Sequence, residues 1–286
     1  MKILSPAKIN LFLQVTGKRA DGYHNLFSLM CCVNLCDTLR LQFGGRHIEI
    51  KSNDPRVPLD ETNYAHRAAR LFFNALKIND GLTVFIEKVI PVAGGLGGGS
   101  SDAAAVLEAL NHRYGQPFTR DRLMALGLCV GADVPFFLFR KPAFARGIGE
   151  KLQVYKWPLP YHVVLVCPTI RVSTAEVFQN LNLGLTKCKK NFTKTSLKKY
   201  RFDVGLHLCN DLETVTASQH PVVEAVTKQL LTHGAVGALM SGSGPSVFGL
   251  FSDCNTAGRA LNVMDKDARW KAYLVDIIHE IHQDSH

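Results

Sequence analysis

A glycine-rich stretch in the first half of the chain places the strongest constraint on its fold. Residues 94–101 hold five glycines and two serines in eight positions, between a β-branched run that ends at Ile90 and an alanine-rich run that follows Asp102. Glycine lets backbone N–H groups converge where a side chain would block their approach. A helix that starts directly after such a loop adds unpaired N–H donors and the positive end of its dipole. The pattern predicts a phosphate-binding loop between a strand and a helix, rather than a flexible linker.

This stretch differs from two common phosphate-binding loops. A Walker A loop ends in Gly-Lys-Ser or Gly-Lys-Thr, whereas no lysine lies between Lys88 and Lys141. The Rossmann fingerprint is matched loosely by Gly95, Gly97 and Ser100, and the preceding strand does not open a clear βαβ unit. Other segments of the sequence are therefore needed to decide which class of phosphate-binding loop this is.

Length and composition indicate a globular protein with a large core. The chain has 286 residues, 47% of them hydrophobic and 20% charged, and no apolar run approaches the roughly 20 residues that span a bilayer. Its first residues run directly into strand-like sequence, which we expect to leave no room for a signal or transit peptide. The eight cysteines form no Cys-x-x-Cys pair, so the sequence suggests neither a zinc site nor a disulfide framework. We therefore expect a cytoplasmic protein.

The net charge of +9 is concentrated in one segment. Seven basic residues and no acidic ones lie between Val177 and Phe202, and the remainder of the chain is nearly balanced. Such a run is typical of a solvated loop, although it can also bind nucleic acid or attract a polyphosphate. Few aromatic residues interleave with the charges, so the segment lacks a stacking platform for bases. The basic residues are Lys187, Lys189, Lys190, Lys194, Lys198, Lys199 and Arg201.

Hydrophobic periodicity predicts an α+β protein of two lobes, 1–155 and 156–286. In the first lobe, strands are expected over 3–16, 26–37, 38–51 and 83–90, with Gly44–Gly45 as a hairpin turn. Helices of that lobe are expected over 63–77, 102–114 and 121–128, the second of them capped by Ser101 or Asp102. In the second lobe, we expect strands over 161–167, 235–239, 246–251 and 272–278, and helices over 172–181, 221–232 and 256–264.

Three further segments, 5–10, 19–24 and 240–246, place small, polar and glycine residues inside apolar sequence. Lys8 and Asn10 lie two residues apart on an expected strand, so their side chains point to the same face. A lysine and an asparagine on an apolar strand are costly unless they have partners. The alternative for Lys8 is an exposed position on an edge strand.

Together, these segments resemble the GHMP kinase superfamily, which includes galactokinase, homoserine kinase and mevalonate kinase. The loop of that family, Pro-x-x-x-Gly-Leu-Gly-Ser-Ser-Ala-Ala, corresponds here to 91–104, with two extra glycines and an inserted aspartate. This form of the loop is similar to that of one branch of the superfamily, whose acceptor is a cytidine diphosphate. The segments 6–13, 19–24, 131–137 and 241–244 are similar to the same branch. The resemblance implies a GHMP kinase fold, with an N-terminal lobe like ribosomal protein S5 and a ferredoxin-like C-terminal lobe.

The resemblance also implies an ATP-dependent small-molecule kinase. It would phosphorylate the 2-hydroxyl of a cytidine diphosphate that carries a methylerythritol arm, in non-mevalonate isoprenoid precursor biosynthesis. Asp133 would accept or orient the hydroxyl proton while Lys8 stabilises negative charge. Mg²⁺ is expected to accompany ATP, with its protein ligands left unassigned. The residues implied at ATP are Asn63 for the adenine and, for the phosphates, Pro91, Val92, Ala93, Gly94, Gly95, Leu96, Gly97, Gly98, Gly99, Ser100 and Ser101.

Six residues are implied at the acceptor. Asn10 would hold the methylerythritol arm, His24 would bind the cytosine edge, and Tyr23 and Phe178 would stack on the two faces of the base. Phe178 has the alternative of a core position on its helix. Ser243 and Gly244 would close the phosphate site from the second lobe.

Two other functions remain open. A different kinase of the superfamily, such as a homoserine kinase, would share the glycine loop but would not need Tyr23 and His24. An RNA-binding protein on a similar left-handed βαβ scaffold would use the basic segment. The kinase hypothesis predicts a small-molecule substrate without nucleic acid or membrane, in a monomer or weak homodimer.

Overall fold

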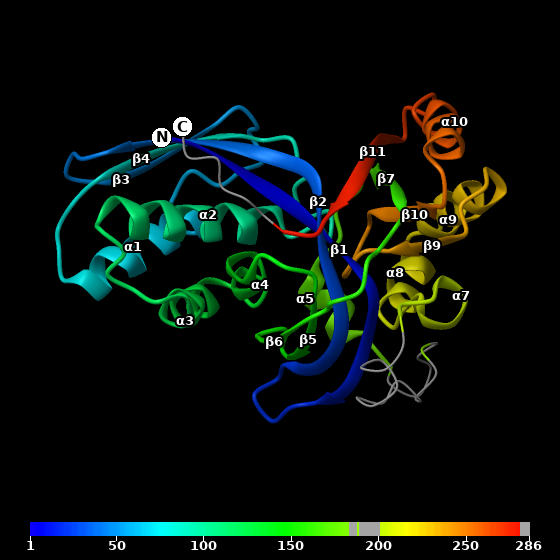
Figure 1. Cartoon of the computed structure of the whole chain (residues 1–286), viewed down its shortest axis with the longest axis horizontal. Helices are drawn as coiled ribbons and strands as arrows, with labels where there is room; N and C mark the ends of the chain where they lie inside the picture. The colour runs from blue at the N-terminus through cyan, green and yellow to red at the C-terminus, as the bar shows by residue number, and fades with distance from the viewer. Residues whose placement is uncertain (183–187, 189–200, 281–286) are drawn as a thin grey trace.

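Two long antiparallel strands form the centre of the molecule. The computed structural model describes residues 1–182, 188 and 201–280, and in it β1 (Lys2–Lys18) pairs with β2 (His24–Phe43) from Lys2 opposite Arg40 to Lys18 opposite His24. Nearly every side chain of β1 from 5 to 15 is buried. A strand covered on both faces has a continuous apolar sequence rather than an alternating one, which explains the composition of 5–15. Figure 1 shows both strands crossing between the two halves of the molecule.

Seven strands, including β2, form one continuous order, β3-β4-β2-β11-β7-β10-β9. Off this order, β1 and β5 pair with β2, β6 pairs with β5, and β8 pairs with β1. The C-terminal strand β11 joins the halves, because it pairs antiparallel with both β2 and β7. The other strands are β3 (Ile48–Ser52), β4 (Leu82–Glu87), β5 (Ala143–Gly147), β6 (Lys151–Val154), β7 (His162–Pro168), β8 (Cys209–Asn210), β9 (Gly237–Met240), β10 (Val247–Phe251) and β11 (Trp270–Ile278).

The hairpin expected at Gly44–Gly45 is wrong. These glycines do connect β2 to β3, but β4 lies between the two strands and pairs antiparallel with β2 and parallel with β3. The start of β4 also packs against this connection, where the Gly44 N–H donates to the Gly81 carbonyl at 3.0 Å. Adjacent glycines between two strands indicate a turn, but the sequence could not show that a third strand enters between them.

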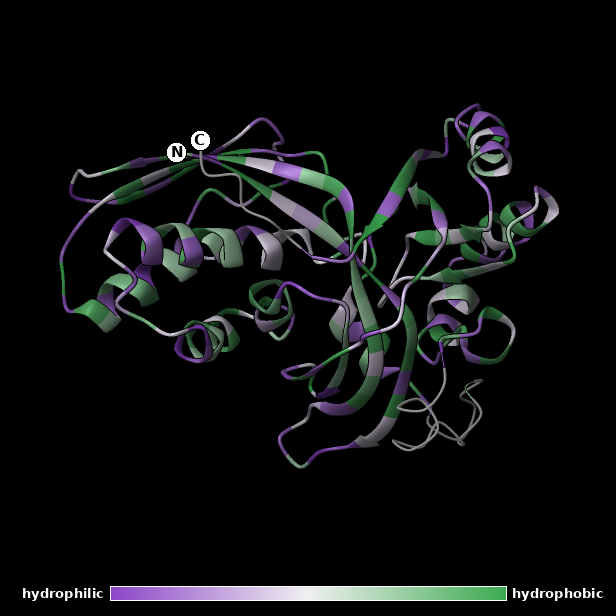
Figure 2. Ribbon diagram, viewed as in Figure 1, coloured by the Kyte–Doolittle hydropathy of each residue, from purple (hydrophilic) through white to green (hydrophobic). Residues whose placement is uncertain are grey.

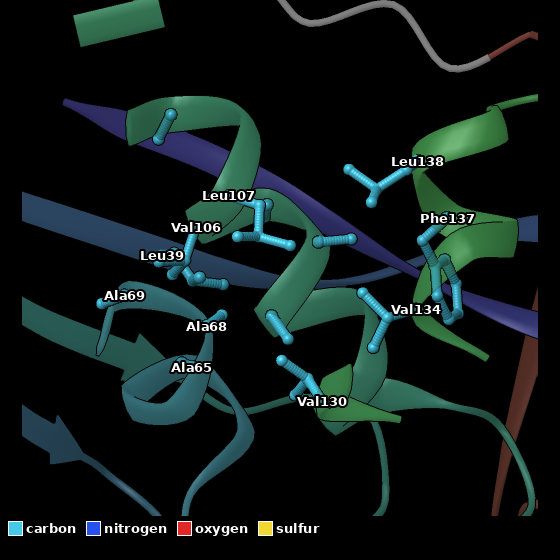
Figure 3. Packing of buried hydrophobic residues seen from close by; sticks show 14 of the residues in the cluster. Leu39, Ala65, Ala68, Ala69, Val106, Leu107, Val130, Val134, Phe137 and Leu138 are labelled. Atoms are coloured by element: carbon cyan, nitrogen blue, oxygen red, sulfur yellow. The ribbon is translucent and has the colours of Figure 1, made fainter. Parts of the chain in front are cut away.

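Four helices cover one face of the first half of the sheet (Figure 1). They are α1 (Tyr64–Leu76), α2 (Gly98–Arg113), α3 (Arg120–Val130) and α4 (Val134–Phe139). Alanines of α1 and α2 let these two helices pack closely, and Figure 3 shows Ala65, Ala68 and Ala69 of α1 beside Val106 and Leu107 of α2. Val134, Phe137 and Leu138 of α4 belong to the same buried cluster. This packing fixes where α2 and α4 begin, and both beginnings lie at the candidate site.

In the second half, α9 (Val222–Thr232) packs against β7, β9 and β10, and α10 (Cys254–Met264) packs against β7, β10 and β11. The other helices of this half are α5 (Thr174–Gln179), α7 (Val204–His207) and α8 (Glu213–Gln219), the last of which contacts α9. In Figure 2 the helices and strands carry both hydrophobic and hydrophilic bands, as expected where one face of an element is buried. None of the helices in the described ranges has the length and apolar character needed to span a bilayer. The α+β fold in two lobes is confirmed; the division at residue 155 stays a prediction.

Cys188 and Cys209 form a disulfide, so the expectation of no disulfide is wrong for this pair. Their spacing of 21 residues carries no motif. Tertiary structure brings them together, because β8 pairs with β1 at Phe12 and because the Cys188 N–H donates to Asp211 Oδ1 at 3.1 Å. The other six cysteines are free. Apart from Cys188 and Arg201, the basic segment 187–201 lies outside the described residues.

Candidate active site

The glycine loop passes directly into α2, and its first helical N–H groups are free. The helix begins at Gly98 with Gly97 as N-cap, whose φ of 71° suits glycine and which offers no side chain for capping. The expected cap at Ser101 or Asp102 is therefore wrong, since both residues lie inside the first turns. Across the described ranges, the N–H groups of Gly98, Gly99 and Ser100 donate no hydrogen bond. Free N–H groups at the positive end of a 16-residue helix form an anion-binding site.

Contacts from one strand and from one loop of the second half hold the glycine loop in place. The Lys8 N–H of β1 donates to the Leu96 carbonyl at 2.9 Å. From the second half, Ser241 Oγ donates to the Gly95 carbonyl at 3.1 Å, and the Ser246 N–H donates to the Gly94 carbonyl at 3.3 Å. The segment 241–246, between β9 and β10, thus closes against the glycine loop, in the region where Ser243 and Gly244 were predicted.

Within that segment, Ser243 has a partner outside the glycine loop. Its Oγ lies 2.7 Å from Thr174 Oγ1 at the start of α5, which links the segment to the helix that carries Phe178. Asn210 of β8 also holds this segment, because its Nδ2 donates to the Met240 carbonyl at 2.8 Å and to the Gly242 carbonyl at 2.7 Å. Contact of Ser243 and Gly244 with phosphate stays a prediction.

Lys8, Asn10 and Asp133 come together beside the loop. Lys8 Nζ donates to Asn10 Oδ1 at 2.6 Å and lies 3.6 Å from Asp133 Oδ2. Lys8 is buried, with 4% of its surface exposed, so the alternative of an exposed edge lysine is excluded. The shared face predicted for Lys8 and Asn10 is confirmed by their hydrogen bond.

Asp133 is free to meet a ligand. It stands just before α4, yet its side chain makes no capping hydrogen bond, and 34% of that side chain is exposed. The Asp133 carboxylate is therefore not used to cap α4. A carboxylate held beside a buried ammonium, next to free helix N–H groups, combines a proton acceptor with two sources of positive potential.

A second lysine–aspartate cluster, which the sequence reasoning missed, lies behind the loop. Lys88 contacts both Asp37 of β2 and Asp102 of α2, the latter at 3.1 Å, and all three side chains are buried. Asp37 also accepts from the N–H groups of Val89 and Ile90 at 2.7 and 2.8 Å. The signal in the sequence is Asp37 at the end of a buried run of β2, because a charge in such a position requires a partner.

This cluster shifts the pKa values of its members. Burial raises the pKa of Asp102 to about 6, against the attraction of Lys88. Burial alone lowers the pKa of Lys88, but the charges of Asp102 and Asp37 outweigh it and raise that pKa above its ordinary value. The cluster ties the first turns of α2 to β2 and to the segment that follows β4.

The predicted base-binding residues lie at the far end of the β1–β2 pair. His24 is buried and its ring stacks on Phe178, with centroids 5.3 Å apart and planes at 22°. Burial, and to a smaller extent Lys18, lowers the pKa of His24, which favours a neutral imidazole able to donate and accept hydrogen bonds. Tyr23 is 59% exposed. The structure thus pairs Phe178 with His24, and the sandwich of a base between Tyr23 and Phe178 stays a prediction.

Asn63 caps α1. Its Oδ1 accepts from the Ala65 N–H at 2.8 Å and its Nδ2 donates to the Pro58 carbonyl at 2.6 Å. The helix predicted over 63–77 is thereby confirmed, whereas the contact of Asn63 with adenine stays a prediction. Residues 91–93 lead into the glycine loop; their contact with phosphate likewise stays a prediction.

The site lacks a dedicated metal cage. No group of three or more His, Cys, Asp or Glu side chains suited to a metal ion occurs in the part of the chain that the structure describes. Ser100 Oγ lies 3.6 Å from the point where a Cβ on Gly131 would stand, two residues before Asp133. The Ser100 hydroxyl therefore lies close to the segment that leads to Asp133.

Known proteins match this chain over both halves. Residues 63–141 match the family GHMP kinases N terminal domain, and residues 198–269 match GHMP kinases C terminal. A protein of Syntrophotalea carbinolica named 4-diphosphocytidyl-2-C-methyl-D-erythritol kinase is 46% identical over 97% of this chain and 99% of its own length. A protein of Syntrophus aciditrophicus with the same name is 43% identical over 96% and 98%.

Solved structures agree with these matches. A crystal structure titled 4-(cytidine 5'-diphospho)-2C-methyl-D-erythritol kinase superposes with a TM-score of 0.77 at 33% identity, over 97% of this chain and 99% of the other. A homoserine kinase from Cytophaga hutchinsonii superposes with a TM-score of 0.74 at 20% identity, over 98% and 95%, and shows the shared fold alone. Since the similarity extends along nearly the whole sequence and both family regions are present, the chain belongs to the GHMP kinase family.

Proposed function

We propose that this chain transfers the γ-phosphoryl group of ATP to the 2-hydroxyl of 4-diphosphocytidyl-2-C-methyl-D-erythritol, in isoprenoid precursor biosynthesis. The observation that carries the proposal is the placement of Asp133 and Lys8, 3.6 Å apart, beside the free N–H groups at the start of α2. That arrangement suits phosphoryl transfer, and the named relatives are similar to this chain along nearly their whole length.

ATP would bind with its phosphates over the glycine loop. The N–H groups of Gly98, Gly99 and Ser100 would donate to phosphate oxygens, assisted by the helix dipole. Mg²⁺ keeps several waters and binds largely through phosphates, so a hydroxyl and a single carboxylate suffice on the protein side. Ser100 and Asp133 would hold it, and the ion would supply charge neutralisation on the transferring group.

The acceptor would lie along the β1–β2 pair. His24 and Phe178 line the place where a cytosine would bind, with Tyr23 exposed beside them. A ring stacked on a base contributes roughly 1–3 kcal/mol. The methylerythritol arm would extend from there to Asn10, and the segment 241–246 would close over the phosphates.

In the transfer, the 2-hydroxyl oxygen attacks the γ-phosphorus and the bond from that phosphorus to the bridging oxygen breaks. The hydroxyl proton passes to Asp133, and ADP leaves with the bridging oxygen. Lys8 stabilises the negative charge on the transferring group. Most of the acceleration comes from alignment and charge stabilisation, because phosphoryl transfer requires little covalent chemistry from the protein.

The test is an ADP-release assay with Mg-ATP and the purified diphosphocytidyl acceptor. We expect turnover with this acceptor and none above background with homoserine, because the His24–Phe178 pair suits a base. Turnover of homoserine alone would point to another kinase of the family. Strong, salt-dependent RNA affinity without turnover would favour the RNA-binding alternative.

The same proposal includes the cellular location, the oligomeric state and the lobe boundary of the enzyme. We expect a cytoplasmic monomer or weak homodimer that needs no nucleic acid or membrane, with the lobes divided near residue 155. Sedimentation at several protein concentrations tests the oligomeric state.

A further inference from the structure

A chain of hydrogen bonds reaches Lys8 from β2 through a residue without an assigned role. Ser28 Oγ donates to the Phe12 carbonyl at 2.6 Å, and Asn10 Nδ2 donates to Ser28 Oγ at 2.9 Å. The other end of the same amide, Asn10 Oδ1, accepts from Lys8 Nζ at 2.6 Å. Ser28 is 2% exposed and Asn10 is 3% exposed, so water has little access to these bonds.

The direction of these bonds is determined by the available protons. A serine hydroxyl has one proton, and Ser28 directs it to the Phe12 carbonyl. Toward Asn10 it therefore acts as an acceptor, which requires the NH₂ end of the amide. The amide oxygen must then face Lys8. In the flipped amide an N–H would face the ammonium, and two donors would oppose each other in a buried place.

The register of the strands brings these groups together. Pairing of β1 with β2 is irregular between Asn10 and Phe12, and such a bulge re-aims side chains next to a site. Ser28 pairs with Leu13, one residue beyond this irregularity. Its hydroxyl thus reaches both the Phe12 carbonyl and the Asn10 amide.

We propose that Ser28 is a positioning residue for phosphoryl transfer, which fixes the Asn10 amide with its oxygen toward Lys8 and so holds the Lys8 ammonium beside Asp133. The proposal rests on the proposed function, since it assigns Lys8 to the transferring phosphoryl group. Ser28 itself touches no reacting atom. It acts through Asn10, which has two partners at opposite ends of one amide.

The experiment compares Ser28→Ala, Ser28→Thr and a matched control, Ser52→Ala. Ser52 of β3 likewise donates to a backbone carbonyl, that of Ile86 at 3.0 Å, and accepts from a neighbour, the Asp54 N–H at 3.2 Å. We expect Ser28→Ala to lower kcat roughly 10- to 100-fold, the range for misplaced catalytic groups, with KM for ATP within about twofold. Ser28→Thr keeps the hydroxyl and should retain most of the activity. Ser52→Ala should leave kcat unchanged.

A second comparison separates positioning from a general structural role. On an Asn10→Ala background, Ser28→Ala should lower kcat by less than about twofold, because the amide through which Ser28 acts is gone. Equal losses on both backgrounds would overturn the proposal. So would a Ser28→Ala protein with wild-type kcat, or a Ser28→Thr protein as impaired as Ser28→Ala.

Two further arms keep the test decisive. If Ser28→Ala does not fold, Ser28→Cys replaces it, and its weakly donating thiol should give an intermediate kcat. Wild-type turnover of the diphosphocytidyl acceptor tests the proposed function by itself. The ratio of variant to wild type, with whichever acceptor the wild type turns over, tests Ser28.

Discussion

Two lysine–aspartate clusters lie beside the glycine loop, and they differ in how deeply their carboxylates are buried. Behind the loop, Lys88 contacts two buried carboxylates, Asp37 and Asp102. In front of it, Lys8 lies 3.6 Å from Asp133, whose side chain is 34% exposed. All three side chains of the first cluster are buried, whereas the second keeps a carboxylate accessible. We therefore expect the buried cluster to affect stability and the accessible pair to affect turnover.

The loop itself separates the two clusters. A Cβ on Gly97 would stand 3.1 Å from Lys8 Cγ, and a Cβ on Gly98 would stand 2.8 Å from Lys88 Nζ. Consecutive glycines thus let one backbone segment pass between two lysines. Gly97, with its φ of 71° and with Phe137 and Lys8 close by, requires glycine, whereas at Gly98 an added Cβ would mainly press on the flexible end of Lys88.

The largest expected effect is on turnover. Asp133→Asn should lower kcat about 10²- to 10⁴-fold, the usual contribution of a positioned acid or base, with little change in the free energy of unfolding. Steady-state kinetics and urea unfolding measure the two quantities. Asp267→Asn, a change at an exposed carboxylate paired with Arg269, is the control and should alter neither. Wild-type kcat in Asp133→Asn would remove Asp133 from its role.

Breaking the buried cluster should instead cost stability. Lys88→Met keeps the length of the side chain but leaves Asp37 and Asp102 without their cation, and the loss of one partner from a buried pair costs about 3–5 kcal/mol. Urea unfolding measures this loss. The matched control is Lys51→Met, which removes an exposed pair with Glu49 and should change the free energy of unfolding by less than about 1 kcal/mol. Similar losses of stability in both variants would mean that burial does not make the Lys88 cluster more important for stability than an exposed ion pair.

A smaller effect should appear in the pH dependence of stability. The pKa of Asp102 is raised from 3.8 to about 6 by burial, so the folded state binds its proton more tightly than the unfolded state. The contribution of Asp102 to stability is then greatest below about pH 4 and declines as the pH rises toward 6. Unfolding of wild type and Asp102→Asn at several pH values isolates this contribution, because the variant lacks the titrating group. A wild-type protein that becomes more stable relative to Asp102→Asn as the pH rises from 4 to 6 would contradict the assignment.

The smallest expected effects come from the glycines. Gly97→Ala must adopt a left-handed conformation, at a cost of about 1–2 kcal/mol, and displaces Lys8, so it should lower kcat. Gly98→Ala is compatible with a helix but presses on Lys88, so it should lower Tm more than kcat. Kinetics and thermal unfolding of both variants test this division. If Gly97→Ala and Gly98→Ala lower kcat equally, the Lys8 cluster and the Lys88 cluster do not differ in their effect on turnover.

Much of the fold could be predicted because its signals are local. The helix that opens at Asn63 and the apolar runs of β7, β10 and β11 depend on neighbours in the sequence. The hairpin at Gly44–Gly45 was wrong because strand pairing is not local: β4 enters between β2 and β3. The Cys188–Cys209 disulfide was missed for the same reason, since β8 reaches β1 only in the folded chain.

The candidate site divides in the same way. Lys8, Asn10 and Asp133 belong to motifs with recognisable residue types at short spacing, so they could be named from the sequence. Ser28 and Lys88 carry no motif, because a serine in a strand and a lysine before a glycine loop are ordinary residues. Their roles depend on hydrogen bonds to partners 14 to 51 residues away. Asn210 is a similar case, since it holds carbonyls 30 and 32 residues away.

The sequence by itself determined that a glycine-rich loop joins a strand to a helix, predicted that this loop binds phosphate, and named the lysine and aspartate beside it. These conclusions depend on residue types and on spacing along the chain. Only the tertiary structure decided that the loop runs between two lysine–aspartate clusters, and which of them stays accessible. The physical reason is that burial and hydrogen-bond direction depend on contacts between residues on different strands. A pattern of neighbouring residues in the sequence does not predict those contacts.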